Sequence, residues 1–102
     1  MKVDQILEIK DNEFLRQFEA EIDGELISVE YAEQPRQLFL TKLIANEEMK
    51  ETGQDQVFLR CVFDKLVEED RVRIMPTCPE VKKFFRANKR KYRKLLPTGI
   101  NL

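Results

Sequence analysis

The chain has 102 residues, of which 42% are hydrophobic and 36% are charged, and it contains no histidine. This composition is typical of one soluble globular domain and excludes a disordered chain. The absence of histidine excludes a Ser-His-Asp or Cys-His nucleophile, and two cysteines are too few for a structural zinc site. We therefore expect a single domain over residues 1–102, with no metal.

The formal net charge of −1 at pH 7 hides an uneven distribution. Residues 1–78 carry 10 basic and 18 acidic side chains, whereas residues 79–102 carry eight basic and one acidic. The C-terminal segment is thus a cationic patch beside an acidic body. No apolar run approaches the ~20 residues that cross a bilayer, and residues 1–4 lack the apolar stretch of a secretory signal. We expect a cytoplasmic protein with no membrane partner.

Strands are predicted in the first half of the chain, where apolar and polar residues alternate. Residues 18–22 and 27–31 both show this period of two, and the first run could begin as early as Phe14. Asp23-Gly24 between them tolerates the positive φ angles of a tight turn, which predicts a hairpin. A third strand is predicted over 38–44, where apolar residues occur at both odd and even positions, which indicates a more deeply buried strand. The polar stretch 46–53 has no apolar period and predicts a loop.

The apolar period becomes helical after this loop. Residues 54–69 predict an amphipathic helix through Leu59, Val62, Phe63 and Leu66. A short strand is predicted over 71–75, followed by a second helix over about 79–88 with proline at its first position. The basic run 89–94 is compatible with continued helix. This order predicts an α/β fold in which a parallel strand pair joins an antiparallel meander, with helices packed on the sheet.

Three features are candidates for chemistry. The junction between the third strand and the first helix offers helix-terminal N–H groups to an anion, with Gly53 for close approach and Lys50 for charge, although one glycine before a helix is more often a plain turn. Cys78 precedes the second helix, where a thiol gains thiolate character, although it could also be a small buried residue; Cys61 is assigned to the core. The third feature is a basic run that could attract phosphates or form a solvated helix face: Lys82, Lys83, Arg86, Lys89, Arg90, Lys91, Arg93 and Lys94.

Several of these segments resemble the small single-domain branch of the GNAT acetyltransferases. In that branch a strand ending in a Leu-Thr-His-Thr-Glu-Val-Pro-like run leads to an Arg-Gly-x-Gly-x-Gly loop and a helix, and a later strand ends in Cys-Pro. Here the strand position holds Phe-Leu-Thr-Lys-Leu-Ile-Ala (39–45), the loop Lys-Glu-Thr-Gly-Gln-Asp (50–55) and the second strand end Met-Pro-Thr-Cys-Pro-Glu-Val (75–81). Phe84 and Tyr92 fit the final helix, so the resemblance covers about residues 14–96.

The resemblance implies a GNAT-like mixed, mainly antiparallel sheet with two packed helices. It implies acetyl-CoA (coenzyme A) as cofactor and an N-acetyltransferase activity toward an unidentified amine. Thr41 to Ala45 would line the pantetheine arm, and Cys78 would be the catalytic residue, a candidate acyl acceptor. The residues around the pyrophosphate would be Lys50, Gly53, Gln54, Asp55 and Gln56.

The sequence departs from the family pattern at the residues that would contact the coenzyme. Glu51 and Asp55 replace two of the three glycines, and each adds a carboxylate where a diphosphate would bind. Lys42 and Ile44 replace the histidine and glutamate of the strand. An alternative is therefore a catalytically degenerate GNAT-fold protein that recognises an acidic ligand, a protein or a nucleic acid through its basic C-terminal helix.

Overall fold

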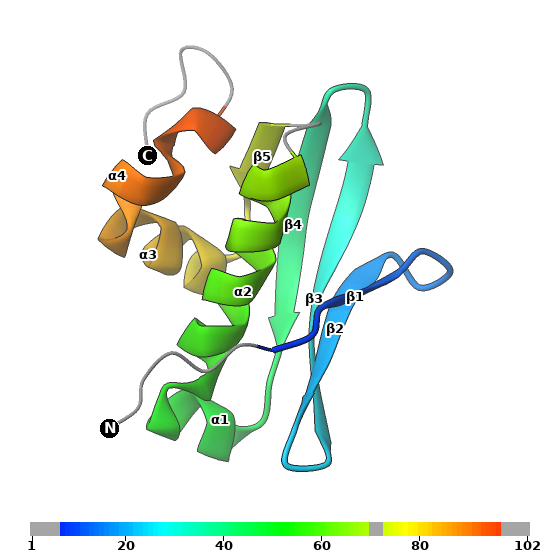
Figure 1. Cartoon of the computed structure of the whole chain (residues 1–102), viewed down its shortest axis with the longest axis vertical. Coiled ribbons are helices and arrows are strands. Elements are labelled where there is room, and N and C mark those ends of the chain that lie inside the picture. Colours follow the sequence, from blue (N-terminus) through cyan, green and yellow to red (C-terminus); the bar gives the residue numbers. More distant parts are fainter. Residues whose placement is uncertain (1–6, 70–72, 97–102) are drawn as a thin grey trace.

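The computed structural model of the protein describes residues 7–69 and 73–96. Five strands form one sheet whose spatial order follows the chain, and the helices lie on one side of it (Figure 1). The strands are β1 (Lys10–Asn12), β2 (Gln17–Ile22), β3 (Glu25–Gln34), β4 (Gln37–Ile44) and β5 (Arg73–Pro76). Strand β1 pairs antiparallel with β2, β2 with β3 and β3 with β4, whereas β4 pairs parallel with β5. This confirms the expected mixed α/β fold with a parallel pair joined to a meander.

The predicted hairpin is present between β2 and β3. Asp23 and Gly24 both have positive φ, 52° and 81°, and they connect the paired residues Ile22 and Glu25. Because both central residues need positive φ, the turn depends on a residue pair that tolerates it. The strand does not begin at Phe14, which is 93% exposed in the preceding turn. Strand β1 was not predicted because its three polar residues show no alternation.

A β-bulge in β4 explains why this strand has apolar residues at both odd and even positions. Glu30 pairs with Lys42 and Tyr31 pairs with Leu40, so Thr41 is the extra residue. Leu40 before the bulge and Leu43 after it are both buried, because the extra residue shifts the side-chain alternation by one. The strand therefore buries one face, and Ile44 is 41% exposed.

The helices are α1 (Glu47–Thr52), α2 (Gln54–Glu69), α3 (Pro79–Ala87) and α4 (Lys89–Tyr92), followed by a 3₁₀ turn (Arg93–Leu95). Helices α2 and α3 match the two expected ones, and the basic run continues as helix. The expectation of a loop over 46–53 is wrong. The Asn46 side chain accepts a hydrogen bond from the Met49 amide and caps α1, and Gly53 ends the helix with φ 81°. Met49 is the one buried residue of α1, so the helix shows no apolar period.

The core lies between the sheet and helices α2 and α3. Its helical half is an aromatic cluster around Phe63, whose ring centroid lies 5.2 Å from Phe84, 6.2 Å from Phe85 and 5.0 Å from Tyr92. Helix α2 is the crossover that carries the chain from β4 to the parallel strand β5. No helix in the described ranges is long and apolar enough to cross a membrane. The expected strand residues Arg71 and Val72 lie outside the described residues.

Candidate functional site

The parallel strands β4 and β5 pair at the edge of the sheet, and their pairing ends halfway along β4. Their pairing runs from Gln37 opposite Arg73 to Leu40 opposite Pro76, and β4 then continues to Ile44 while β5 ends. The Leu40 carbonyl closes this pairing, because it accepts from the Thr77 amide at 3.0 Å and the Cys78 amide at 3.3 Å. Beyond this point the second half of β4 has no strand partner on this side within the described residues, and the chain after β5 turns into α3. We call this separation of the two backbones the opening.

Thr41 and Cys78 lie at the point where this opening begins. Thr41 is the bulge residue of β4, and its hydroxyl donates to the Glu30 carbonyl over 3.2 Å. Bulges bend a strand, change where its side chains point and are frequent beside active sites. Cys78 is the N-cap residue of α3 and is only 4% exposed. The structure thus places both residues next to the Leu40 carbonyl in the chain path, but their side chains differ in environment, because Thr41 is exposed and Cys78 is buried.

Glu80 connects Cys78 to Lys50 across the opening. The Cys78 thiol donates to Glu80 Oε1 over 3.0 Å, and Lys50 Nζ on α1 lies 3.7 Å from Glu80 Oε2. The hydrogen bond from Cys78 lowers the pKa of the Glu80 carboxyl, aided by its own backbone amide and by the charge of Lys50. Sequence reasoning missed Glu80 as a site residue. The available signal was its place as the acidic residue in the first turn of the helix that Cys78 caps.

The expected pyrophosphate loop is instead a tight junction between two helices. Gly53 ends α1, and α2 begins at Gln54. The Gln56 amide donates to the Gly53 carbonyl at 3.1 Å and to Asp55 Oδ1 at 2.8 Å. Asp55 is 7% exposed. Its carboxylate therefore caps an amide that the GNAT resemblance assigns to the diphosphate.

Two other predicted residues lie near this junction without joining Cys78. Ala45 is half-buried and packs against the core. Gln54 lines a cavity of about 200 Å³ between the β2–β3 turn and α1, together with Ile22, Asp23, Glu25, Asn46, Glu48, Met49 and Thr52. Gln54 thus lines a cavity that does not include Cys78.

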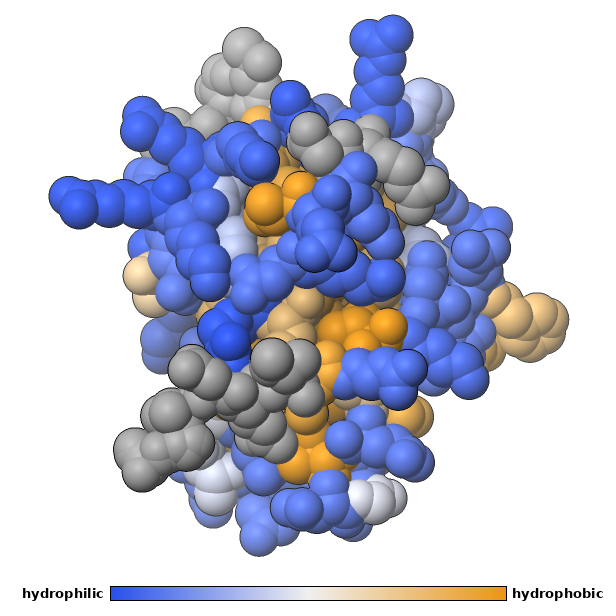
Figure 2. Space-filling view, in the orientation of Figure 1, coloured by the Kyte–Doolittle hydropathy of each residue, from blue (hydrophilic) through white to orange (hydrophobic). Residues whose placement is uncertain are grey.

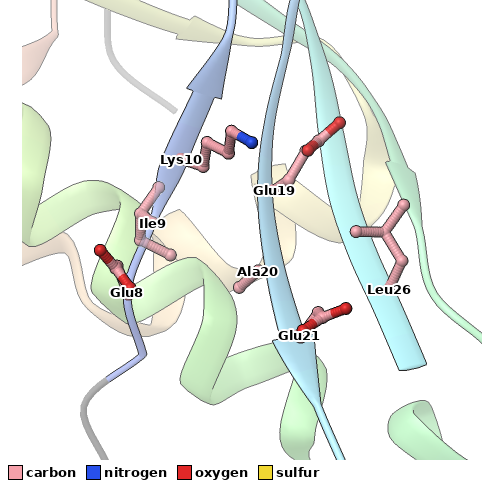
Figure 3. A pocket seen from close by; sticks show the side chains of 7 residues that line it. All are labelled: Glu8, Ile9, Lys10, Glu19, Ala20, Glu21 and Leu26. Atoms are coloured by element: carbon pink, nitrogen blue, oxygen red, sulfur yellow. The ribbon is translucent and has the colours of Figure 1, made fainter. Parts of the chain in front are cut away.

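Two larger hollows lie elsewhere on the sheet. One of about 790 Å³ is formed by the start of β1 and the adjacent parts of β2 and β3 (Figure 3). Its lining includes the carboxylates Glu8, Glu19 and Glu21. A shallow hollow of about 600 Å³ lies at the β3–β4 turn and includes Phe39 and Thr41. None of these three cavities is lined by Cys78 or Gly53, so none of them joins the helix junction to Cys78.

Tyr92, which the resemblance placed on the final helix, is a structural anchor. It is 1% exposed, and its hydroxyl donates to Asp64 Oδ1 on α2 over 2.8 Å. Burial raises the pKa of the Tyr92 phenol, and the hydrogen bond to Asp64 adds to this shift. The group is thus a neutral hydrogen-bond donor at neutral pH, and it ties α4 to α2.

Replacing Tyr92 by phenylalanine is expected to lower the free energy of unfolding by about 1 kcal/mol, because one hydrogen bond is lost while the ring still fills its site. Urea denaturation at pH 7 measures this. Because folding raises the phenol pKa above its unfolded value, the Tyr92 contribution is complete below about pH 10 and declines as the pH rises further. A Tyr92→Phe, Asp64→Asn double-mutant cycle with no coupling energy would contradict the assignment.

The cations of the C-terminal segment form an exposed surface over α3, α4 and the 3₁₀ turn. Hydrophilic side chains project from these elements in the space-filling view (Figure 2). Lys91 is paired with Asp64 at 3.3 Å, and its ammonium lies 5.3 Å from the centre of the Tyr92 ring. The other exposed cations of this surface are Lys83, Arg86, Lys89, Arg90, Arg93 and Lys94. The structure therefore confirms exposure of the basic run but shows no aromatic side chain exposed within its described part, 82–94.

No model of a known protein family matches the chain, and no curated protein is significantly similar to it. Within residues 7–69 and 73–96, no group of three or more cysteine or carboxylate side chains is placed to hold a metal ion. The function is therefore inferred from the geometry of the opening between β4 and α3.

Proposed function

We propose that the protein binds acetyl-CoA in the opening between β4 and α3 and acts as an N-acetyltransferase-like protein on an amine. One observation carries the proposal: the parallel pair separates after Leu40 and Pro76, with Cys78 at the point of separation. An opening of this kind leaves strand backbone on one side and a helix start on the other. Together they could hold the extended, amide-containing arm of the coenzyme by backbone hydrogen bonds.

The residues of the site fit the two ends of the coenzyme unequally. The Thr41 to Ile44 edge of β4 extends past the end of β5, which suits the pantetheine arm. At the other end, Asp55 caps the Gln56 amide and Glu51 is exposed, which opposes a diphosphate. Lys50 contributes a positive charge there, although Glu80 partly neutralises it. We therefore expect weak coenzyme binding that depends mainly on the arm.

When bound, the coenzyme would supply an acetyl thioester that an amine can attack. The part of this chain would be to orient that thioester and to offer N–H groups to the developing oxyanion, since such donors stabilise acyl transfer. The acidic body would favour a cationic amine as acceptor. The activity proposed is N-acetyl transfer, with the acceptor defined only as an amine.

Titration of ¹⁵N-labelled protein with coenzyme A tests binding directly. We expect amide shifts at Thr41 to Ala45 and at Cys78, with smaller shifts near Gly53. Pantetheine alone should shift the β4 amides, whereas adenosine 3′,5′-bisphosphate alone should act only near Gly53. The absence of any shift near Gly53 or along β4 at millimolar coenzyme A would end the proposal.

The capped amide and the uncompensated cations favour one alternative, a GNAT-fold protein that binds a partner without catalysis. Asp55 occupies an amide of the expected loop, and six exposed cations of the C-terminal surface have no salt bridge within the described residues. This surface would take an acidic ligand, protein or nucleic acid, with binding that weakens as salt increases. Acetyl transfer to any amine, abolished by a change in the opening, would rule this alternative out.

A further inference from the structure

The C-terminal surface carries six exposed cations that form no salt bridge within the described residues. These cations are Lys83, Arg86, Lys89, Arg90, Arg93 and Lys94. The salt bridges that α3 and α4 form there use other side chains, because Glu80 pairs with Lys50 and Lys91 pairs with Asp64. Glu80 is also the single acidic residue of positions 79–102. The positive charge of this surface is therefore not neutralised by the neighbouring side chains.

The spacing of the cations places them on the side of the helices away from the core. Helix α3 buries Phe84 and Phe85 and exposes Lys83 and Arg86, which are three positions apart and share one side of the helix. Helix α4 buries Tyr92 and exposes the cations before it. Both helices lie at the side of the molecule opposite β1 and β2 (Figure 1). The cations thus form one continuous surface over adjoining helices.

We propose that the C-terminal surface binds double-stranded DNA through its phosphate backbone, without reading the base sequence. The proposal rests on the binding alternative given above, whose partner it names, and it does not require coenzyme A. A DNA duplex carries one negative charge per about 1.7 Å of its axis, so six neighbouring cations meet several phosphates at once. Residues 1–78 hold 18 acidic and 10 basic side chains, and this acidic part repels DNA from the rest of the molecule.

The composition of the surface favours a duplex over other acidic partners. None of the three hollows described above is lined by the six cations, so a small anion has no enclosed site among them. Within 82–94, Ala87 is the one exposed apolar residue. Protein interfaces and membrane-surface helices depend on exposed aromatic and aliphatic side chains, which this segment lacks. Single strands stack their bases on exposed aromatic rings, which are also absent from 82–94.

Helix α3 suits the groove of DNA better than that of duplex RNA. An α-helix with its side chains is about 10–12 Å across, and the major groove of B-DNA is about 12 Å wide. The exposed side of α3 can therefore lie along that groove while its cations contact phosphates at the edges. The major groove of duplex RNA is deep and narrow, so the same cations would contact fewer phosphates.

Fluorescence anisotropy with a labelled DNA duplex tests the proposal on the full chain over a series of salt concentrations. The surface variant is Lys83→Gln, Arg90→Gln. The matched control is Lys10→Gln, Arg36→Gln, which removes one exposed lysine and one exposed arginine from β1 and from the β3–β4 turn. The other probes are a DNA duplex of unrelated sequence, duplex RNA, single-stranded DNA, poly-glutamate and phosphatidylserine vesicles. Circular dichroism checks that each variant folds.

We expect the two DNA duplexes to bind equally, because phosphates carry no base sequence. With six phosphate contacts, the affinity should fall about 10³-fold between about 50 and 200 mM salt. The surface variant should bind more weakly at low salt, and the slope of log affinity against log salt should decrease by about two. The control variant should match the parent protein, and the other probes should bind more weakly than duplex DNA.

Several results would overturn the proposal. These are no binding at low salt, an affinity independent of salt, and equal losses in the surface variant and the control. Equal or tighter binding of duplex RNA, poly-glutamate or the vesicles would assign the surface to a different partner. Titration with coenzyme A separates the two functions. Amide shifts with coenzyme A but no DNA binding overturn the present proposal only, whereas DNA binding without those shifts overturns the coenzyme site only.

Discussion

Replacing Phe63 by alanine is expected to lower the free energy of unfolding by about 3–5 kcal/mol. Phe63 is completely buried on α2, and its ring contacts Phe84, Phe85 and Tyr92. These rings attach α3 and α4 to the rest of the protein, so the cavity left by alanine would loosen both helices. Small domains have a total stability of about 5–15 kcal/mol, so the variant should lose a large part of it. Urea denaturation followed by circular dichroism measures the change.

Phe14 provides a matched control for this prediction. It is 93% exposed in the turn between β1 and β2, so Phe14→Ala removes the same atoms without making a cavity. We expect it to change the unfolding free energy by less than about 0.5 kcal/mol. Equal losses in the two variants would show that Phe63 is not the centre of the helical core.

Removing the two carboxylates from the helix junction should strengthen coenzyme A binding. The double variant Glu51→Gln, Asp55→Asn deletes both negative charges, and asparagine can still accept the Gln56 amide at Oδ1. Each charge opposes a diphosphate by about 1 kcal/mol. We therefore expect an affinity gain of about tenfold or more by isothermal titration calorimetry.

A control variant far from the junction and a change of salt concentration distinguish this electrostatic effect from other causes. Glu68→Gln removes an exposed charge at the other end of α2 and should leave the affinity unchanged. Raising the salt concentration should narrow the difference between the double variant and the parent. If the double variant binds no better at low salt, the diphosphate does not lie at this junction.

The elements that the sequence predicts well are those whose local pattern agrees with the tertiary structure. The Asp23-Gly24 turn forms as expected because few other residue pairs accept two positive φ angles. Helix α2 occupies the predicted range because its buried side chains repeat at the helical period. Helix α1 was missed because its stability comes from the Asn46 cap and a single buried methionine, Met49.

Strand β4 shows how a local pattern can mislead. Apolar residues at odd and even positions suggested a more deeply buried strand, but the bulge at Thr41 shifts the alternation so that one face is buried. The position of the bulge depends on the pairing of β4 with Glu30 and Tyr31 of β3. This pairing cannot be predicted from the β4 residues alone.

The candidate site was predicted in part. Thr41 and Cys78 were selected from the sequence, and the structure places both where the parallel strands separate. Glu80 was missed because its significance lies in contacts with Cys78 and with Lys50, which is 30 positions earlier in the chain. The capping role of Asp55 was also hidden, since the direction of a side chain depends on its surroundings.

The amino-acid sequence alone predicts the strands with a period of two, the amphipathic helices, the hairpin and the cationic C-terminal segment. Each of these depends on residues close together in the chain, whose spacing fixes which side chains share a face. The three-dimensional fold was needed to locate the end of the β4–β5 pairing and to identify the groups that meet at Cys78. Those contacts join segments separated by tens of residues, and their energies depend on packing and distance in space.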